Sequence, residues 1–561
     1  MGQHLQWAVN IGTAIQSAGR VLIERPASVL PVYLLVLGIT AITRVPIVVG
    51  IAVALGLLVA DGRLEALFEA IEGVDFAALE ETGPEGELDP GAIPPELETA
   101  VLDILSPEIA AIVGLAAVVA VVVGIVSNGI SNAAAINGIY GCLYDGDGVA
   151  DAVVGVGRDW KAFVGIAIVE VAVVLIGIVP LIIGVSLFAV SGAAGVAATL
   201  VGGLLSAAII LGGLLALAFA GQSVVVEGST LGGAIRRSAG FPFREPLSFV
   251  AYVLVALGVF GGLSVLGALF AVLGVSQLTG IISPLVAIPF LDAFKTALYA
   301  DRPFVGRSTG AQTQSSAAAT DGGSDRPEYD SDDDPAEDPV DSAGEPVGDP
   351  RGTEPQPETE PPAYRHQFVA AFRDGLSAVG EFTRQQPASI LAATVLFVAA
   401  AAAGWQLTAE FALDLPADEG IGEVFGTVPI GAFVMIAANN WLVSATAIFG
   451  GVALGVPTAV DMLLNGFVVG ALAGVIDPVA FAALVAPHGV IELPAIVLAG
   501  GLGLHVGVTT LGVLRGSRPS SDLAEVLRLA YRVLLGLAVI LVVAAFVEAF
   551  LTPAIAAFVL T

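Results

Sequence analysis

The chain has 561 residues, of which 56% are hydrophobic and 13% are charged, and its formal net charge is −31. Its mean hydropathy of +0.89 excludes an ordinary soluble globular protein, and it has no basic stripe that would bind nucleic acid. The single cysteine, Cys142, excludes an internal disulfide and a cysteine-rich metal site. Uncharged runs of about 18 or more residues instead predict an all-α, polytopic membrane protein.

The acidic charge lies mostly outside these apolar runs, and lysine occurs only at Lys161 and Lys295. Acid-rich, lysine-poor polar surfaces are typical of halophilic proteins, because strong salt screens their self-repulsion. We therefore expect a halophilic archaeal source. No positively charged segment with a small-residue cleavage site opens the chain, so we expect no removable signal peptide.

The first 305 residues form a predicted six-span membrane domain with an acidic outer loop at 61–108. Arg44 and Pro46 interrupt the first apolar stretch, which is too long for one straight crossing. The sequence leaves open whether this stretch is one kinked span or two short ones. The predicted spans are residues 27–58, 109–136, 163–190, 196–222, 247–273 and 278–298.

Residues 363–561 form a second predicted membrane domain, with spans at 388–407, 428–449, 458–476, 489–511 and 533–551. In both domains the arginines gather on one side of the spans. The positive-inside rule then places the N-terminus and the connection between the domains in the cytoplasm. With five spans in the second domain, the C-terminus is expected outside the cell.

The connection, residues 306–362, is rich in Asp, Glu, Pro, Gly, Ser and Thr and cannot bury a core, so we expect a disordered tether. It acts either as a spacer or as a docking segment for a protein partner. An amphipathic helix precedes Pro26 in one domain and Pro387 in the other, and we expect both helices to lie in the membrane interface. Their predicted apolar faces are Trp7, Ile11, Ile15, Ala18 and Leu22, and Phe368, Phe372, Leu376, Val379 and Phe382.

The last third of the chain sets small and polar residues into an apolar frame. They are Asn439-Asn440, Gly450-Gly451, Leu454-Gly455, Asn465-Gly466, Gly470 and Pro487-His488-Gly489-Val490-Ile491-Glu492-Leu493-Pro494-Ala495. In order and spacing, residues from about 364 to 561 resemble the stage II sporulation protein M family. The resemblance implies a five-span membrane domain that recruits partners and has no catalysis of its own. The cell-wall-degrading partners of its bacterial namesakes are not expected for an archaeal chain.

The N-terminal half is loosely similar to archaeal membrane domains of unknown function. Some of these resemble the membrane part of glycerophosphodiester phosphodiesterases. The catalytic barrel of those enzymes is absent here, and the likeness implies no site residues.

His488 and Glu492 are four residues apart, so a helix places them on one face. A span beginning at Gly489 would put Glu492 in its first turn, where the helix dipole favours a carboxylate. Asn439, Asn440 and Asn465 lie in or near neighbouring spans, within reach of the pair. These five residues either lock the helices together by hydrogen bonds or form a proton or ion path through His488 and Glu492.

Weaker candidates lie elsewhere in the spans. Glu170 faces a possible partner surface of Asn128, Asn132 and Asn137, and Glu548 is expected at the membrane interface. The zinc-protease pattern is absent, and no nucleotide-binding glycine motif is present. We therefore expect no catalytic residue, no cofactor and no metal.

The sequence favours a non-enzymatic membrane scaffold, and a proton- or ion-coupled transporter is the alternative. The expected partners are membrane lipids and unidentified membrane or cytoplasmic proteins, and a homo-oligomer is compatible with the sequence.

Overall fold

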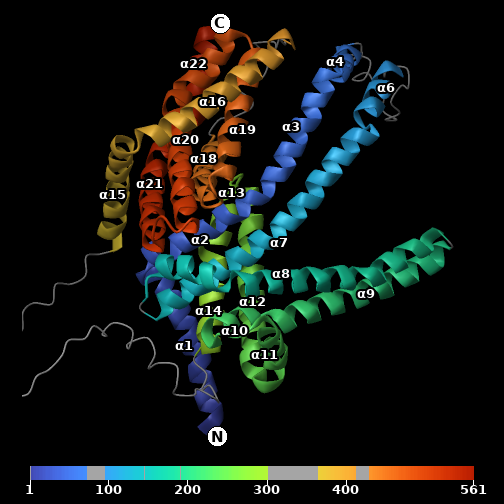
Figure 1. Cartoon of the computed structure of the whole chain (residues 1–561), viewed down its shortest axis with the longest axis vertical. Helices are drawn as coiled ribbons and strands as arrows, with labels where there is room; N and C mark the ends of the chain where they lie inside the picture. Colours follow the sequence, from blue (N-terminus) through green and yellow to red (C-terminus); the bar gives the residue numbers. More distant parts are fainter. Residues whose placement is uncertain are drawn as a thin grey trace, which may run out of the picture. The chain divides into compact units, whose positions relative to one another are not determined.

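The computed structural model describes residues 2–72, 95–144, 146–189, 191–300, 364–411 and 429–560, and every regular element in these ranges is a helix (Figure 1). Residues 1–301 and 369–561 form one compact unit. The predicted tether at 306–362 and the tip of the predicted acidic loop, 73–94, lie outside the described residues.

The N-terminal half begins with a long helix, α1, and continues through long apolar helices joined by short ones. The elements are α1 Gly2–Glu24, α2 Pro26–Ala41, η1 Ile42–Arg44, α3 Val45–Ala60, α4 Arg63–Glu72, α6 Pro95–Ile104, α7 Pro107–Leu143, α8 Gly148–Ser186, η2 Leu187–Ala189, α9 Gly192–Leu217, α10 Ala220–Glu227, α11 Leu231–Arg244, α12 Pro246–Val272, α13 Gln277–Ile282, η3 Ser283–Ala287 and α14 Ile288–Ala300.

The C-terminal half also opens with a long helix that precedes a proline. Its elements are α15 Tyr364–Gln385, α16 Pro387–Thr408, η4 Ala409–Phe411, α18 Ile430–Phe449, η5 Gly450–Val452, α19 Val456–Val475, α20 Pro478–Leu514, α21 Ser520–Phe546, η6 Val547–Leu551 and α22 Thr552–Leu560. The segments η3 and η6 are single π-helical turns, in which the backbone carries one extra residue per turn.

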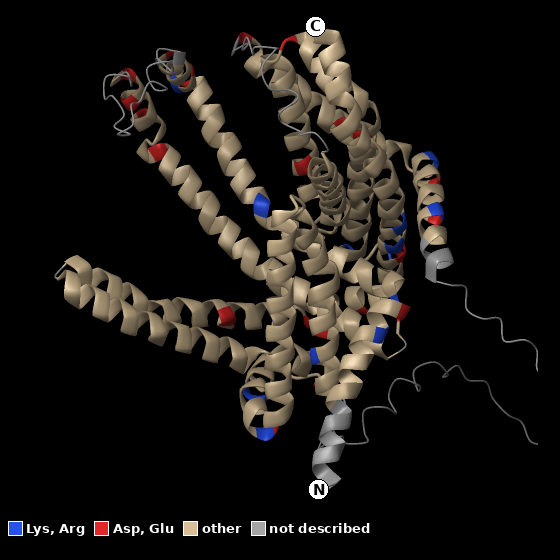
Figure 2. Cartoon of the chain, turned by 180° about the vertical axis from the view of Figure 1, so that it is seen from behind, with Lys and Arg blue, Asp and Glu red and all other residues tan. Residues whose placement is uncertain are grey.

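Within the described residues, 11 helical segments are long and apolar enough to cross a membrane, which confirms the predicted count. Figure 2 shows these helices free of Lys, Arg, Asp and Glu over most of their length. Several continue beyond the predicted spans: α7 and α20 each have 37 residues, or about 55 Å at 1.5 Å per residue. Since the hydrocarbon core is about 30 Å thick, these helices extend past it or tilt within it.

The first apolar stretch is one continuous helical segment, Pro26–Ala60, with the 3₁₀ turn η1 at its middle. Pro46 follows this turn and tolerates it, because a proline near a helix start lacks no needed N–H donor. The structure therefore favours one kinked span over two short ones.

The two halves of the chain pack directly against each other. Helix α2 contacts α18, and α8 contacts α21. One buried apolar cluster draws side chains from both halves, among them Tyr33 and Phe294 from the first and Ile448 and Leu534 from the second. Gly38 of α2 lies against the backbone of Phe449, where a Cβ atom would overlap it. The two halves thus share one core.

The amphipathic helices pack on protein rather than only on the membrane interface. Helix α1 contacts α14 and buries Ala14 and Ala18, while Ile15, predicted for the apolar face, is exposed. In α15, Gly375 packs on Gly536 of α21, and Ala378 and Phe382 are buried. Small residues on these faces permit close helix–helix contact, which the interfacial interpretation did not anticipate.

Candidate functional site

Helix α20 begins earlier than the sequence indicated, and this changes the setting of its ionisable pair. Asp477 caps it by accepting hydrogen bonds from the backbone N–H groups of Val479 and Ala480, at 2.9 and 3.0 Å. Pro478 occupies the first turn, and Pro487 and Pro494 are accommodated in the interior. The prediction that a span starts at Gly489 is therefore wrong.

His488 and Glu492 consequently lie in the third and fourth turns of α20. The helix macrodipole acts within the first turn, so it does not stabilise the Glu492 carboxylate. The two side chains do share one face, as their spacing predicted. What neutralises or pairs the carboxylate must therefore come from neighbouring helices.

Glu548 supplies the neighbouring group that the sequence interpretation missed. It lies in the π turn η6, and its Oε2 atom is 3.9 Å from Nε2 of His488. One ligand atom from each of His488, Glu492 and Glu548 lies within 4.8 Å of the others. We call these three residues the His–Glu–Glu cluster. Two helical segments separated along the chain bring it together.

The three predicted asparagines fall in three different environments. The side chain of Asn440, which is buried on α18, forms a hydrogen bond with Glu492. Asn439 is exposed on the same helix. Asn465 donates to the backbone carbonyl of Asp461, 2.7 Å away on α19. Only Asn440 thus has a recorded contact with the pair.

Glu170 has a different partner from the one expected. It is partly buried on α8 and interacts electrostatically with Lys295 of α14. The asparagines expected to face it bond elsewhere: Asn132 donates to the Asn128 side chain at 3.2 Å, and Asn137 donates to Asp159 at 3.2 Å. Glu170 is therefore separate from the His–Glu–Glu cluster in its contacts.

Two buried atoms of the cluster have no hydrogen-bond partner: Nδ1 of His488 and Oε2 of Glu492. Buried polar atoms are nearly always paired, so an unpaired set at one place indicates that a proton, water or ion completes it. Imidazole and carboxylate groups transfer protons and bind cations. The arrangement can therefore hold helices together, carry protons or bind a cation.

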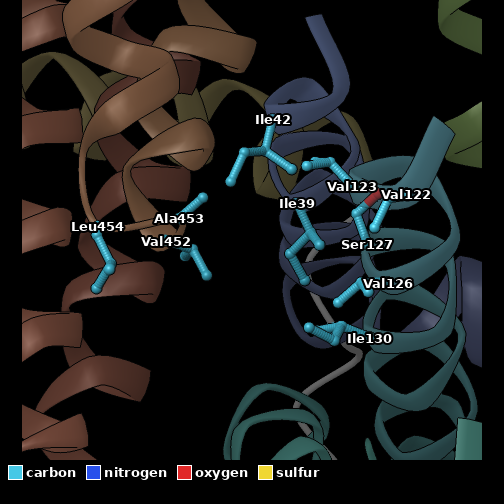
Figure 3. Close-up of a pocket in the computed structure, with 10 residues that line it drawn as sticks. All are labelled: Ile39, Ile42, Val122, Val123, Val126, Ser127, Ile130, Val452, Ala453 and Leu454. Carbon is cyan, nitrogen blue, oxygen red and sulfur yellow. The ribbon is translucent and has the colours of Figure 1, made fainter. Parts of the chain in front are cut away.

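An apolar cavity of about 360 Å³ lies between the two halves (Figure 3). Its lining comes from α2 and η1, from α7, and from η5 and the two residues after it. Ser127 is its polar exception, and that hydroxyl donates to the carbonyl of Gly124. Leu454 in the wall has a φ of 61°, a left-handed conformation that is strained for a branched side chain. An apolar lining of this kind offers no groups for acid–base chemistry.

The model of the family described as stage II sporulation protein M matches residues 393–553. An uncharacterised protein of Methanocaldococcus jannaschii is 31% identical over 138 residues, which is 23% of this chain and 75% of that protein. The chain belongs to the stage II sporulation protein M family. No solved structure matches it.

The stage II sporulation protein M region runs from α16 into α22 and contains the complete His–Glu–Glu cluster together with Asn440. The N-terminal half lies outside the matched residues. The family and the apolar helices together establish an integral, multi-pass membrane protein.

Proposed function

We propose that this protein is a non-enzymatic membrane scaffold that recruits partner proteins through the acidic segment 306–362. The observation that carries the proposal is the shared core of the two halves. Because α14 and α15 both belong to that compact unit, the segment is not needed as a spacer between independent domains. Docking of a partner then accounts better for a long acidic segment at this place.

The proposed orientation follows from the arginines. The N-terminus and the acidic segment face the cytoplasm, and the C-terminus faces outward. Cytoplasmic partners then meet the segment, and its negative charge selects basic surfaces on them.

The test replaces residues 306–362 with a neutral Gly/Ser segment of equal length in the full chain. We expect the protein to fold, since the two halves pack without the segment, but to lose its cross-linked partners in cells. The matched control keeps the composition of the segment and shuffles its order. If the Gly/Ser variant retains every cross-link of the wild type, the docking proposal is wrong.

A second candidate function is proton- or ion-coupled transport through His488, Glu492 and Glu548. The unpaired buried atoms of the cluster favour it, since ionisable groups at membrane depth commonly mark ion and proton pathways. Its test is flux in liposomes: Glu492→Gln abolishes transport while the protein stays folded. Equal flux in Glu492→Gln and wild-type vesicles contradicts this candidate.

A further inference from the structure

The His–Glu–Glu cluster combines the donor atoms that divalent transition metals prefer. It offers one imidazole nitrogen and two carboxylate oxygens, all within 4.8 Å of one another. Around a tetrahedral Zn²⁺ with bonds of about 2.1 Å, donor atoms lie about 3.4 Å apart. The 3.9 Å between His488 Nε2 and Glu548 Oε2 is close to that spacing. Rotation of the glutamate side chains can close the rest.

The charges at this place require a counter-ion. Glu492 and Glu548 bring two carboxylates together in an apolar helical bundle, and their charges repel each other. Among the described residues, no Lys or Arg forms an ion pair with either carboxylate. Unpaired charge costs several kcal/mol in such surroundings. A dication neutralises both carboxylates at once, and neutral His488 adds a ligand without adding charge.

The unpaired atoms supply an independent observation. Nδ1 of His488 and Oε2 of Glu492 are buried and lack hydrogen-bond partners, although the side chains around them are well packed. The His488 side chain is 14% exposed and that of Glu548 is 26% exposed, so bulk water does not fully solvate either group. Lone pairs shielded in this way are available to a metal ion.

Two further features prepare the site. Asn440 forms a hydrogen bond with Glu492, and such outer partners orient ligating carboxylates. The π turn η6 sets Glu548 out of the regular helical register, and π turns occur often at functional sites. Three protein ligands leave the fourth tetrahedral position open, as in exchangeable zinc sites.

We propose that His488, Glu492 and Glu548 bind a divalent transition-metal cation of the zinc type, with Asn440 positioning Glu492. The site goes beyond the scaffold function and does not depend on it. It also replaces protons with a metal as the species that the cluster holds.

The test uses the full chain with a non-histidine affinity tag, purified in mild detergent at high salt. The protein is stripped with EDTA, reloaded with Zn²⁺, dialysed and analysed for metal. We expect one zinc ion per wild-type chain. Glu492→Gln and Glu548→Gln, which keep side-chain size, lose the ion, and Asn440→Ala weakens zinc affinity by about tenfold or more.

Asp461→Asn is the matched control, because Asp461 is a partly buried carboxylate of α19 outside the cluster. It should bind zinc like the wild type. Wild-type protein that retains no zinc, or Gln variants that retain as much as wild type, overturn the proposal. If the Gln variants do not fold, Co²⁺ added to the wild type decides: visible absorption bands of four-coordinate cobalt support the site, and their absence overturns it.

Discussion

Neighbouring asparagines on α18 have opposite surroundings at the scale of single residues. Asn440 is buried and bonded to Glu492, whereas Asn439 is exposed. A hydrogen bond between helices in a bilayer typically contributes about 1 kcal/mol. The pair therefore offers a matched experiment on a single helix.

We expect Asn440→Ala to lower the free energy of unfolding by about 1 kcal/mol, because it leaves the Glu492 carboxylate without its donor. Asn439→Ala should change stability by less than about 0.5 kcal/mol. Thermal unfolding of metal-free protein in detergent measures both. Equal effects of the two substitutions would show that the bond to Glu492 does not matter for stability.

Sequence spacing predicted that His488 and Glu492 share a face, because helical periodicity is local information. It could not predict Glu548, which is 56 residues further along and depends on a π turn in another segment. It also misplaced the start of α20, since Pro487 was interpreted as a boundary. In a membrane bundle, neighbouring side chains and water can satisfy the carbonyl that an interior proline leaves free.

At the scale of elements, small residues hold α16 and α19 together. Gly466 and Gly470 of α19 lie against the carbonyls of Phe397 and Ala401 of α16, where a Cβ atom would overlap them. This is the small-xxx-small arrangement that brings membrane helices close. The eleven spans were predictable from hydropathy, but the faces on which they meet were not.

We expect Gly470→Leu to destabilise the bundle by about 1–3 kcal/mol, because the side chain forces α16 and α19 apart. Gly258→Leu on α12 is the control, since nothing lies within 4 Å of the position of its Cβ atom. Thermal unfolding in detergent compares the two variants. A Gly470→Leu protein as stable as Gly258→Leu would contradict the close packing of the pair.

On the scale of the whole molecule, two kinds of contact join the halves. One is apolar and close, as between Gly38 and Phe449. The other is ionic: Arg528 of α21 pairs with Asp147, the cap of α8, and their side chains are 39% and 48% exposed. The physics of these contacts predicts very different contributions.

A protease site introduced into residues 306–362 allows the halves to be separated covalently. We expect the cleaved halves to co-elute in size-exclusion chromatography, because they share a buried core. Gly38→Leu should make them elute apart, whereas Gly56→Leu, whose Cβ atom would meet nothing within 4 Å, should not. Independent elution of the cleaved wild-type halves would refute the shared core.

Arg528→Ala should leave the cleaved halves together and lower stability by at most about 1 kcal/mol. Even this effect should vanish at 1 M salt, where the Debye length is about 3 Å. Melting curves at low and high salt measure it. A large loss that persists at high salt would mean that Arg528 stabilises the interface by packing rather than by charge.

The π turn at Glu548 also bears on the order of biosynthesis. Glu548 follows Glu492 by 56 residues, which take roughly 3–11 s to synthesise at about 5–20 residues per second. During that interval His488 and Glu492 enter the membrane without their third partner. The cluster closes only when the helix carrying Glu548 is inserted, so an occupied cluster marks a chain whose insertion is complete.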